Sequence, residues 1–166
     1  MAAILIDQAP DDIPGMDAGA AAVARGIARL FRRNQIWVTS EVSLPNGRRA
    51  DLMGLDEKGQ IVIVEIKVSK ADLLGDMKWP EYLDYCDRFY WGIGADIEAA
   101  LLDRQDFMPE RSGLIVADAY DAEILRPAST VALAAARRKS ETARLARLAL
   151  RRMALMIDPP APGQIF

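Results

Sequence analysis

The stretch that decides the fold is residues 60–69, with the sequence QIVIVEIKVS. It is β-branched and apolar along nearly its whole length, which is typical of a strand buried on both faces of a sheet. Side chains alternate across a strand, so Glu65 and Lys67 share one face with Ile61 and Ile63. Charges at the end of a core strand are costly unless they are paired or bind something. A metal site at the open end of the sheet would offset that cost.

The composition is that of a soluble globular domain. The 166 residues are 51% hydrophobic and 27% charged, enough for one domain with a substantial core. No apolar stretch approaches the length of a membrane span, so no membrane partner is expected. The opening MAAILID lacks a basic n-region and is too short for a secretory signal, which favours a cytoplasmic location.

The residue types that are missing narrow the chemistry. The chain has one cysteine, Cys86, which excludes an internal disulfide and a cysteine zinc cluster. It has no histidine, which excludes Ser-His-Asp and Cys-His catalysis and histidine-bound zinc. Any metal is therefore expected to be a hard cation held by oxygen atoms, such as Mg²⁺ or, as its substitute, Mn²⁺.

The net charge of −3 argues against a nucleic-acid partner, but the distribution of the basic residues along the chain favours one. Seven of the 21 lysines and arginines lie between Arg137 and Arg152, together with one glutamate. Four arginines also gather on the polar side of the first expected helix: Arg25, Arg29, Arg32 and Arg33. A solvated basic face and a phosphate-binding face both explain these four arginines.

The pattern along the chain predicts a single domain at 17–157, between an N-terminal arm at 1–16 and a Pro-rich tail at 158–166. The expected elements are, in order, a helix from Asp17 to about Asn34, antiparallel strands at 36–44, 48–56 and 60–69, a short helix after Ser69, a helical piece after Pro80, a strand at 88–93, a short helix at 96–103, a strand at 113–117, an extended piece at 123–125 and a basic helix at about 131–156. The turn Pro45-Asn46-Gly47 is a strong hairpin signal. The aromatic residues at 79–91 are expected in the core, with Trp79 alone kept open as a base-stacking residue.

Asp51 lies in the strand that the hairpins place beside Glu65. These two carboxylates, joined by the backbone carbonyl of Ile66, would hold a divalent cation, and Lys67 would orient a water molecule and stabilise charge on a phosphate. The alternative is an ion pair at the sheet edge without a catalytic role.

Three stretches resemble one family: EVSLPNGRRAD (41–51), VEIKVS (64–69) and DMKWPEYLDYCDRFYW (76–91). They are similar to the MmcB-related DNA repair proteins, which belong to the PD-(D/E)XK nuclease superfamily. The resemblance covers about residues 17–119. It implies an α/β, restriction-endonuclease-like αβββαβ core with a mixed sheet flanked by helices, followed here by a C-terminal helix. It also implies that Asp51, Glu65 and Lys67 are the catalytic residues. Ala50 stands where the superfamily motif has a proline, a departure that removes no ligand.

Many relatives carry a further acidic residue on the first helix, and here none follows Asp17 up to Asn34. Glu41 is the better candidate for a supporting carboxylate, and an ion pair with Arg48 or Arg49 explains it equally well. The residues expected to contact DNA are basic side chains near the catalytic strands and on the last helix: Arg48, Arg49, Lys70, Lys78, Arg144, Arg147 and Arg151.

The resulting expectation is a Mg²⁺-dependent endonuclease that hydrolyses DNA phosphodiester bonds in repair. The alternative is a weak or inactive nuclease-fold module that binds duplex, branched or damaged DNA, or a repair partner. The intact Asp51, Glu65 and Lys67 set favours the enzyme, because a pure binder does not need it. The residues alone leave RNA open as a substrate, and a homodimer is an option because cutting both strands often needs two sites.

Overall fold

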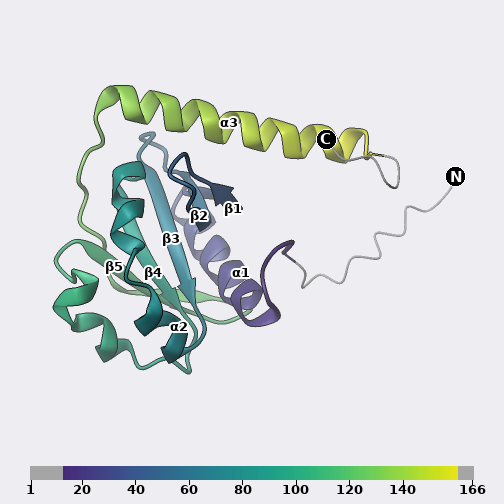
Figure 1. Ribbon diagram of the computed structural model, residues 1–166. Helices are drawn as coiled ribbons and strands as arrows, with labels where there is room; N and C mark the ends of the chain where they lie inside the picture. Colours follow the sequence, from purple (N-terminus) through teal and green to yellow (C-terminus); the bar gives the residue numbers. More distant parts are fainter. Residues whose placement is uncertain (1–12, 161–166) are drawn as a thin grey trace, which may run out of the picture.

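A computed structural model of the protein describes residues 13–160. Six strands form one sheet, with helices on both faces (Figure 1). The elements are, in order, α1 (Ala18–Arg33), β1 (Trp37–Ser43), β2 (Arg49–Leu55), β3 (Ile61–Lys67), α2 (Lys70–Gly75), η1 (Trp79–Tyr85), β4 (Arg88–Ile93), η2 (Ala99–Asp103), η3 (Gln105–Phe107), β5 (Ser112–Ala117), β6 (Ala122–Arg126) and α3 (Ala135–Ile157). Most of the predicted arm at 1–16 and tail at 158–166 lies outside the described residues.

The sheet is mixed, and its spatial order follows the chain order from β1 to β6. β1, β2 and β3 form an antiparallel meander, β4 and β5 continue parallel to β3, and β6 returns antiparallel. The order α1-β1-β2-β3-α2-β4, with a mixed sheet flanked by helices and a C-terminal helix, confirms the expected fold class.

Helix α1 covers one face of the sheet. Its first turn is capped by Asp17, whose carboxylate accepts a hydrogen bond from Ala20 N at 2.8 Å. The apolar stripe that the sequence predicts on this helix is buried against β3, β4 and β5. The core on this face is formed by Val23, Ala24, Ile27, Phe31, Ile36, Leu52, Val62, Val64, Ile66, Tyr90, Ile115 and Ala117. The even-numbered side of the central strand therefore faces α1, as alternation requires.

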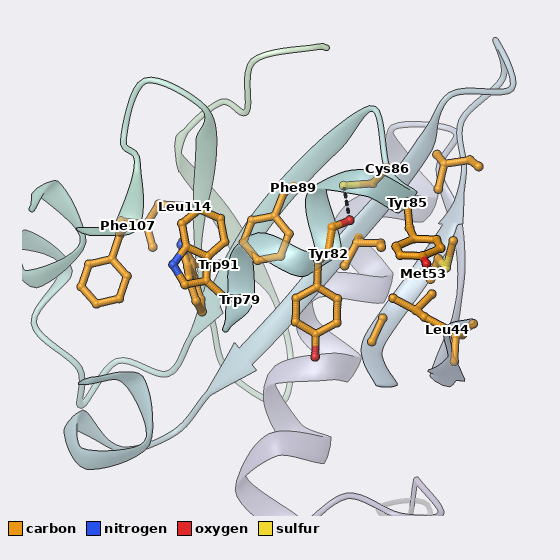
Figure 2. Packing of buried hydrophobic residues seen from close by; sticks show 14 of the residues in the cluster. Leu44, Met53, Trp79, Tyr82, Tyr85, Cys86, Phe89, Trp91, Phe107 and Leu114 are labelled. Atoms are coloured by element: carbon orange, nitrogen blue, oxygen red, sulfur yellow. Dashed lines mark hydrogen bonds between the residues drawn. The ribbon is translucent and has the colours of Figure 1, made fainter. Parts of the chain in front are cut away.

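An aromatic cluster fills the opposite face (Figure 2). Trp79 packs against Phe89 and Trp91 with ring centroids 5.1 and 5.2 Å apart, and Phe107 contacts Trp91 at 5.5 Å. Trp79 is 2% exposed, and its indole N–H donates to the carbonyl of Asp106 at 3.1 Å. The idea that Trp79 stacks on a base was therefore wrong, because its ring faces are used in the core. Cys86 is fully buried, as predicted.

The last helix starts at Ala135 rather than near Val131, because backbone N–H groups of the preceding segment donate hydrogen bonds to Asp87 instead of to helical carbonyls. Val131 N donates to the carbonyl of Asp87 at 2.9 Å, and Leu133 N donates to its carboxylate at 2.9 Å. Arg138 donates to both oxygens of the same carboxylate, at 2.8 and 2.6 Å. Burial alone would raise the pKa of Asp87, but the hydrogen bonds that its carboxylate accepts from Leu133 N, Ile61 N and Arg138 lower it on balance. Asp87 thus fastens α3 to the sheet.

Two arginines of α3 cover the free edge of β1. Arg144 donates to the carbonyl of Ser43, and Arg152 donates to the carbonyl of Ser40 at 2.7 Å and to the hydroxyl of Thr39. Unpaired edge strands invite pairing with other chains, so these contacts protect the sheet. Beyond them the end of α3 extends past β1 (Figure 1). Within residues 13–160, no helix has the length and apolar character needed to cross a membrane.

Candidate active site

The site lies where the sheet opens between β2 and β3. The pairing of β2 with β3 runs from Leu55↔Ile61 to Leu52↔Val64 and then stops. On its other side, β3 stays paired with β4 as far as Lys67. At the next step the carboxylate of Asp51 accepts the N–H of Ile66 at 2.6 Å in place of a backbone partner. The side chains of Asp51 and Glu65 therefore meet on the same face of two neighbouring strands.

Glu65 and Lys67 are buried at the rim of the aromatic core, 7% and 5% exposed. Glu65 Oε1 lies 3.4 Å from Lys67 Nζ. Among the described residues, no hydrogen-bond donor reaches the buried Glu65 Oε2. Burial raises the pKa of the Tyr82 hydroxyl, and the carboxylate of Glu65 lies close enough to raise it further, but the one proton of this hydroxyl is donated to the carbonyl of Arg49 at 3.0 Å. An unsatisfied buried carboxylate oxygen is costly, and a cation would satisfy it.

The two carboxylates have strongly perturbed acidities. Burial raises the pKa of Asp51 from 3.8 to about 6, and the charge of Glu41 adds to this effect, although the bond from Ile66 and the charge of Lys67 oppose it. Burial also raises the pKa of Glu65, to about 8, and the adjacent charge of Asp51 is the next cause. Both shifts have burial as their largest cause, so this corner disfavours the charged form of the two carboxylates unless a cation binds there.

Lys67 is held by a residue that the sequence analysis did not single out for this role. Its Nζ lies 2.9 Å from Asp76 Oδ2 and 3.7 Å from Asp72 Oδ1. Ser69 caps α2 by accepting the N–H of Asp72 at 3.1 Å, which turns the chain back over the end of β3. Burial alone would lower the pKa of Lys67, but the charges of Glu65 and Asp76 raise it, so its ammonium stays charged. The signal available in the sequence was the position of Asp76 at the start of the stretch 76–91, which resembles the family.

Glu41 extends the cluster on the β1 side. It stands opposite Asp51 in the register set by Ser40↔Leu52, in a left-handed backbone conformation with φ of 53°. Arg49 Nε lies 2.5 Å from Glu41 Oε2, so the ion pair that one interpretation expected is present. Arg48 pairs instead with Glu81 at 2.8 Å. Both arginines therefore border the site, each with a carboxylate partner.

The remaining residues expected to contact DNA fall into two groups. Lys70 and Lys78 are exposed on the segment between β3 and η1. Arg147 and Arg151 are exposed on α3, whereas Arg144 is held by Glu141 and by the carbonyl of Ser43. The donors of Arg144 are thus used within the chain, where they hold the helix on the sheet.

The donor set suits a hard divalent cation with few protein ligands. Asp51, Glu65 and the carbonyl of Ile66 would supply the oxygens, and the unsatisfied Glu65 Oε2 is the observation that fits a cation. Across residues 13–160, no group of three or more acidic, cysteine or histidine side chains is arranged to hold a metal ion. Magnesium tolerates such a sparse set, because water and substrate phosphate oxygens complete its coordination.

Comparison with known proteins agrees with the fold and places the chain in a family. The model of the MmcB-like family, described as DNA repair protein MmcB-like, matches residues 9–160. The chain therefore belongs to the MmcB-like family. The structure is also similar to that of the SPO1766 protein of unknown function from Silicibacter pomeroyi, with a TM-score of 0.78 and 39% sequence identity. That match covers 90% of this chain and 99% of the other. The search of curated proteins found no match.

Proposed function

We propose that the protein is a Mg²⁺-dependent nuclease of the PD-(D/E)XK type that hydrolyses DNA phosphodiester bonds in repair. The observation that carries the proposal is the unsatisfied, buried Glu65 Oε2 beside the carboxylate of Asp51, with the ammonium of Lys67 on the same strand as Glu65. Membership of a DNA repair family supports DNA as the substrate.

Asp51 and Glu65 would hold the cation, together with the carbonyl of Ile66. A magnesium ion bound by these residues would supply Lewis-acid polarisation of the phosphate. Lys67, buried and charged, places a fixed positive charge where the phosphate oxygens would lie and can orient a water molecule. Asp76 holds Lys67 in position at 2.9 Å and does not contact the substrate in this scheme.

The substrate would approach the rim where the basic side chains gather. Arg48 and Arg49 closely precede Asp51 along the chain, and Lys70 and Lys78 lie on the segment that follows β3. Contacts of such side chains with the DNA backbone position DNA without reading its sequence. Since both arginines already have carboxylate partners, phosphate would have to compete with Glu81 and Glu41.

A second candidate is a DNA-binding module that does not cleave. The described residues provide only a sparse set of metal ligands, and this observation favours it. The same fold would then present the basic rim to DNA, and the buried charges would have only a structural role.

The test is incubation of supercoiled, single-stranded and branched DNA with Mg²⁺ or Mn²⁺. The wild type is compared with Asp51→Asn, Lys67→Ala and Asp84→Asn, the last an exposed carboxylate on η1 that serves as a matched control. Metal-dependent cleavage by the wild type and the control, lost in the other two, is the expected result. Binding without cleavage, alike in all four proteins, would establish the binding module instead.

A further inference from the structure

One flank of α3 carries an apolar stripe that the sheet does not cover. Residues spaced alternately by three and four positions share one face of a helix. On α3 this spacing gives five apolar residues, all of them exposed: Ala143, Ala146, Leu150, Met153 and Ile157. Leu150, Met153 and Ile157 are 65%, 59% and 86% exposed. The solvated face of a helix normally carries polar side chains, so a stripe of this kind marks a surface that binds a partner.

The stripe is separate from the side of α3 that holds the helix on the sheet. Leu145 is buried against the core, and Arg152 donates to Ser40 and Thr39 of β1. Leu145 and Arg152 lie within about 20° of each other around the helix, whereas the centre of the stripe lies about 120° away. A partner on the stripe would therefore bind beside the contact between α3 and the sheet without displacing it.

The stripe borders an apolar hollow between α3 and the sheet. The hollow has a volume of about 240 Å³, and its lining includes Trp37, Thr39, Met53, Leu55, Ala146 and Ala149. Strand alternation and the register Trp37↔Leu55 put the first four of these on the face of the sheet toward α3. None of the described residues that line the hollow is charged. Stripe and hollow thus form one continuous apolar surface.

Side-chain size changes along the stripe. Its first half consists of Ala143 and Ala146, and its second half consists of Leu150, Met153 and Ile157. Two such helices packed in parallel would set alanine against alanine and leave a void. Packed antiparallel, they set the large side chains of each against the alanines of the other, as close packing requires. The stripe is therefore complementary to a reversed copy of itself, which is the property of a two-fold interface.

We propose that this surface binds a second copy of the chain, with the two α3 helices packed antiparallel about a two-fold axis near the middle of the stripe. The end of α3 that carries Met153 and Ile157 extends past β1 (Figure 1). In the dimer this end would lie over the hollow beside Trp37 of the other copy. The inference goes beyond the proposed function, and it holds whether or not the protein cleaves DNA.

The area of the surface matches a dimer of modest affinity. Its five large apolar side chains are each more than half exposed: Trp37, Leu150, Met153, Met156 and Ile157. Together they present roughly 400 Å² of apolar surface on each copy. With the apolar share of roughly two-thirds that dimer interfaces have, burying this area on both copies gives a total of roughly 1,200 Å², the lower limit of a stable interface. A dissociation constant in the micromolar range follows.

The test is sedimentation equilibrium of the full chain, without DNA and in EDTA, at about 1–300 µM, a range that brackets a micromolar dissociation constant. The wild type should pass from monomer to dimer. Leu150→Glu should weaken dimerisation by at least about 10-fold, because it places like charges close together near the two-fold axis. Tyr120→Glu is the matched control, since it changes an equally exposed apolar residue between β5 and β6, and it should dimerise like the wild type.

A charge exchange separates loss of the interface from loss of the fold. Leu150→Lys should dimerise as weakly as Leu150→Glu, and an equimolar mixture of the two variants should dimerise again. Two misfolded proteins would not restore each other.

Thiol cross-linking tests the orientation of the helices. A short cross-linker should join two copies of Leu150→Cys but not two copies of Ile157→Cys, because antiparallel packing separates the residues at 157 by about 20 Å. Cys86 is buried, so it does not compete for the reagent.

Three outcomes would overturn the inference. A wild type that stays monomeric throughout the range would leave the stripe to a different protein or to the apolar residues 1–6 of the same chain. A dimer that Leu150→Glu leaves intact would have its interface elsewhere. Cross-linking of Ile157→Cys but not of Leu150→Cys would refute the antiparallel arrangement. DNA cleavage enters none of these measurements, so this inference and the nuclease proposal stand or fall separately.

Discussion

Replacing Asp51 with asparagine should stabilise the metal-free protein at alkaline pH while abolishing metal binding. The side chain keeps its size, and its amide oxygen can still accept the N–H of Ile66, which now donates to the carboxylate at 2.6 Å. The introduced NH₂ group can donate to Glu65 Oε2, which among the described residues has no donor. Removing the charge also lowers the pKa of Glu65, because Asp51 contributes to raising it.

The magnitude follows from proton linkage. The pKa of Asp51 is 3.8 when unperturbed and about 6 in the fold, so between these values the folded state holds the proton more tightly than the unfolded state. The contribution to stability is full below pH 3.8, is lost as the pH rises, and is gone above about pH 6. A shift of about 2 units corresponds to about 3 kcal/mol, an upper value for a partly hydrated site. For a protein of this size that is about 6–12 °C in Tm.

The assay is thermal unfolding of the wild type, Asp51→Asn and Asp84→Asn, at pH 5 and pH 8, each in EDTA and in excess Mg²⁺. In EDTA the wild type and the control should lose more stability from pH 5 to pH 8 than Asp51→Asn does. Mg²⁺ should raise the Tm of the wild type and the control at pH 8, with a smaller rise at pH 5 where protons compete for the carboxylates. If Asp51→Asn is less stable than the wild type at pH 8 in EDTA, the carboxylate is not under electrostatic stress and the reasoning fails.

Three further changes test other parts of the structure. Asp76→Ala should lower the rate of cleavage, because Lys67 loses the carboxylate that holds its ammonium, and it should leave the Mg²⁺-induced rise in Tm intact. Partial recovery of the rate in Asp76→Asn would show that the hydrogen bond matters. Unchanged rates in both variants would remove Asp76 from the positioning role. Asp87→Ala should destabilise the protein by about 3–5 kcal/mol in urea unfolding, because it leaves Arg138 and two backbone N–H groups without their partner, and a loss below 1 kcal/mol would contradict this. Gly54→Ala should unfold the β1–β2 pairing or prevent soluble expression, since a Cβ atom there would lie 1.9 Å from a carbonyl oxygen of β1, and a wild-type Tm would refute the close approach.

The central meander and the meeting of Asp51 with Glu65 could be predicted from the sequence. The β-branched run at 60–69, the hairpin turn at 45–47 and the two-residue alternation of strands are local signals, and together they specify which side chains share a face. The stripe of α1 and its Asp17 cap are local signals of the same kind, and both appear in the structure.

The partners of the charged side chains were decided by the tertiary structure. Asp76 meets Lys67 because α2 folds back over the end of β3, and Arg144 meets Ser43 because α3 returns to the edge strand from the far end of the chain. Helix α3 begins later than the sequence predicts for the same reason, because the N–H groups of Val131 and Leu133 donate to Asp87 rather than to helical carbonyls. Local sequence determines periodicity and burial, whereas an ion pair depends on distances between segments that only packing brings together.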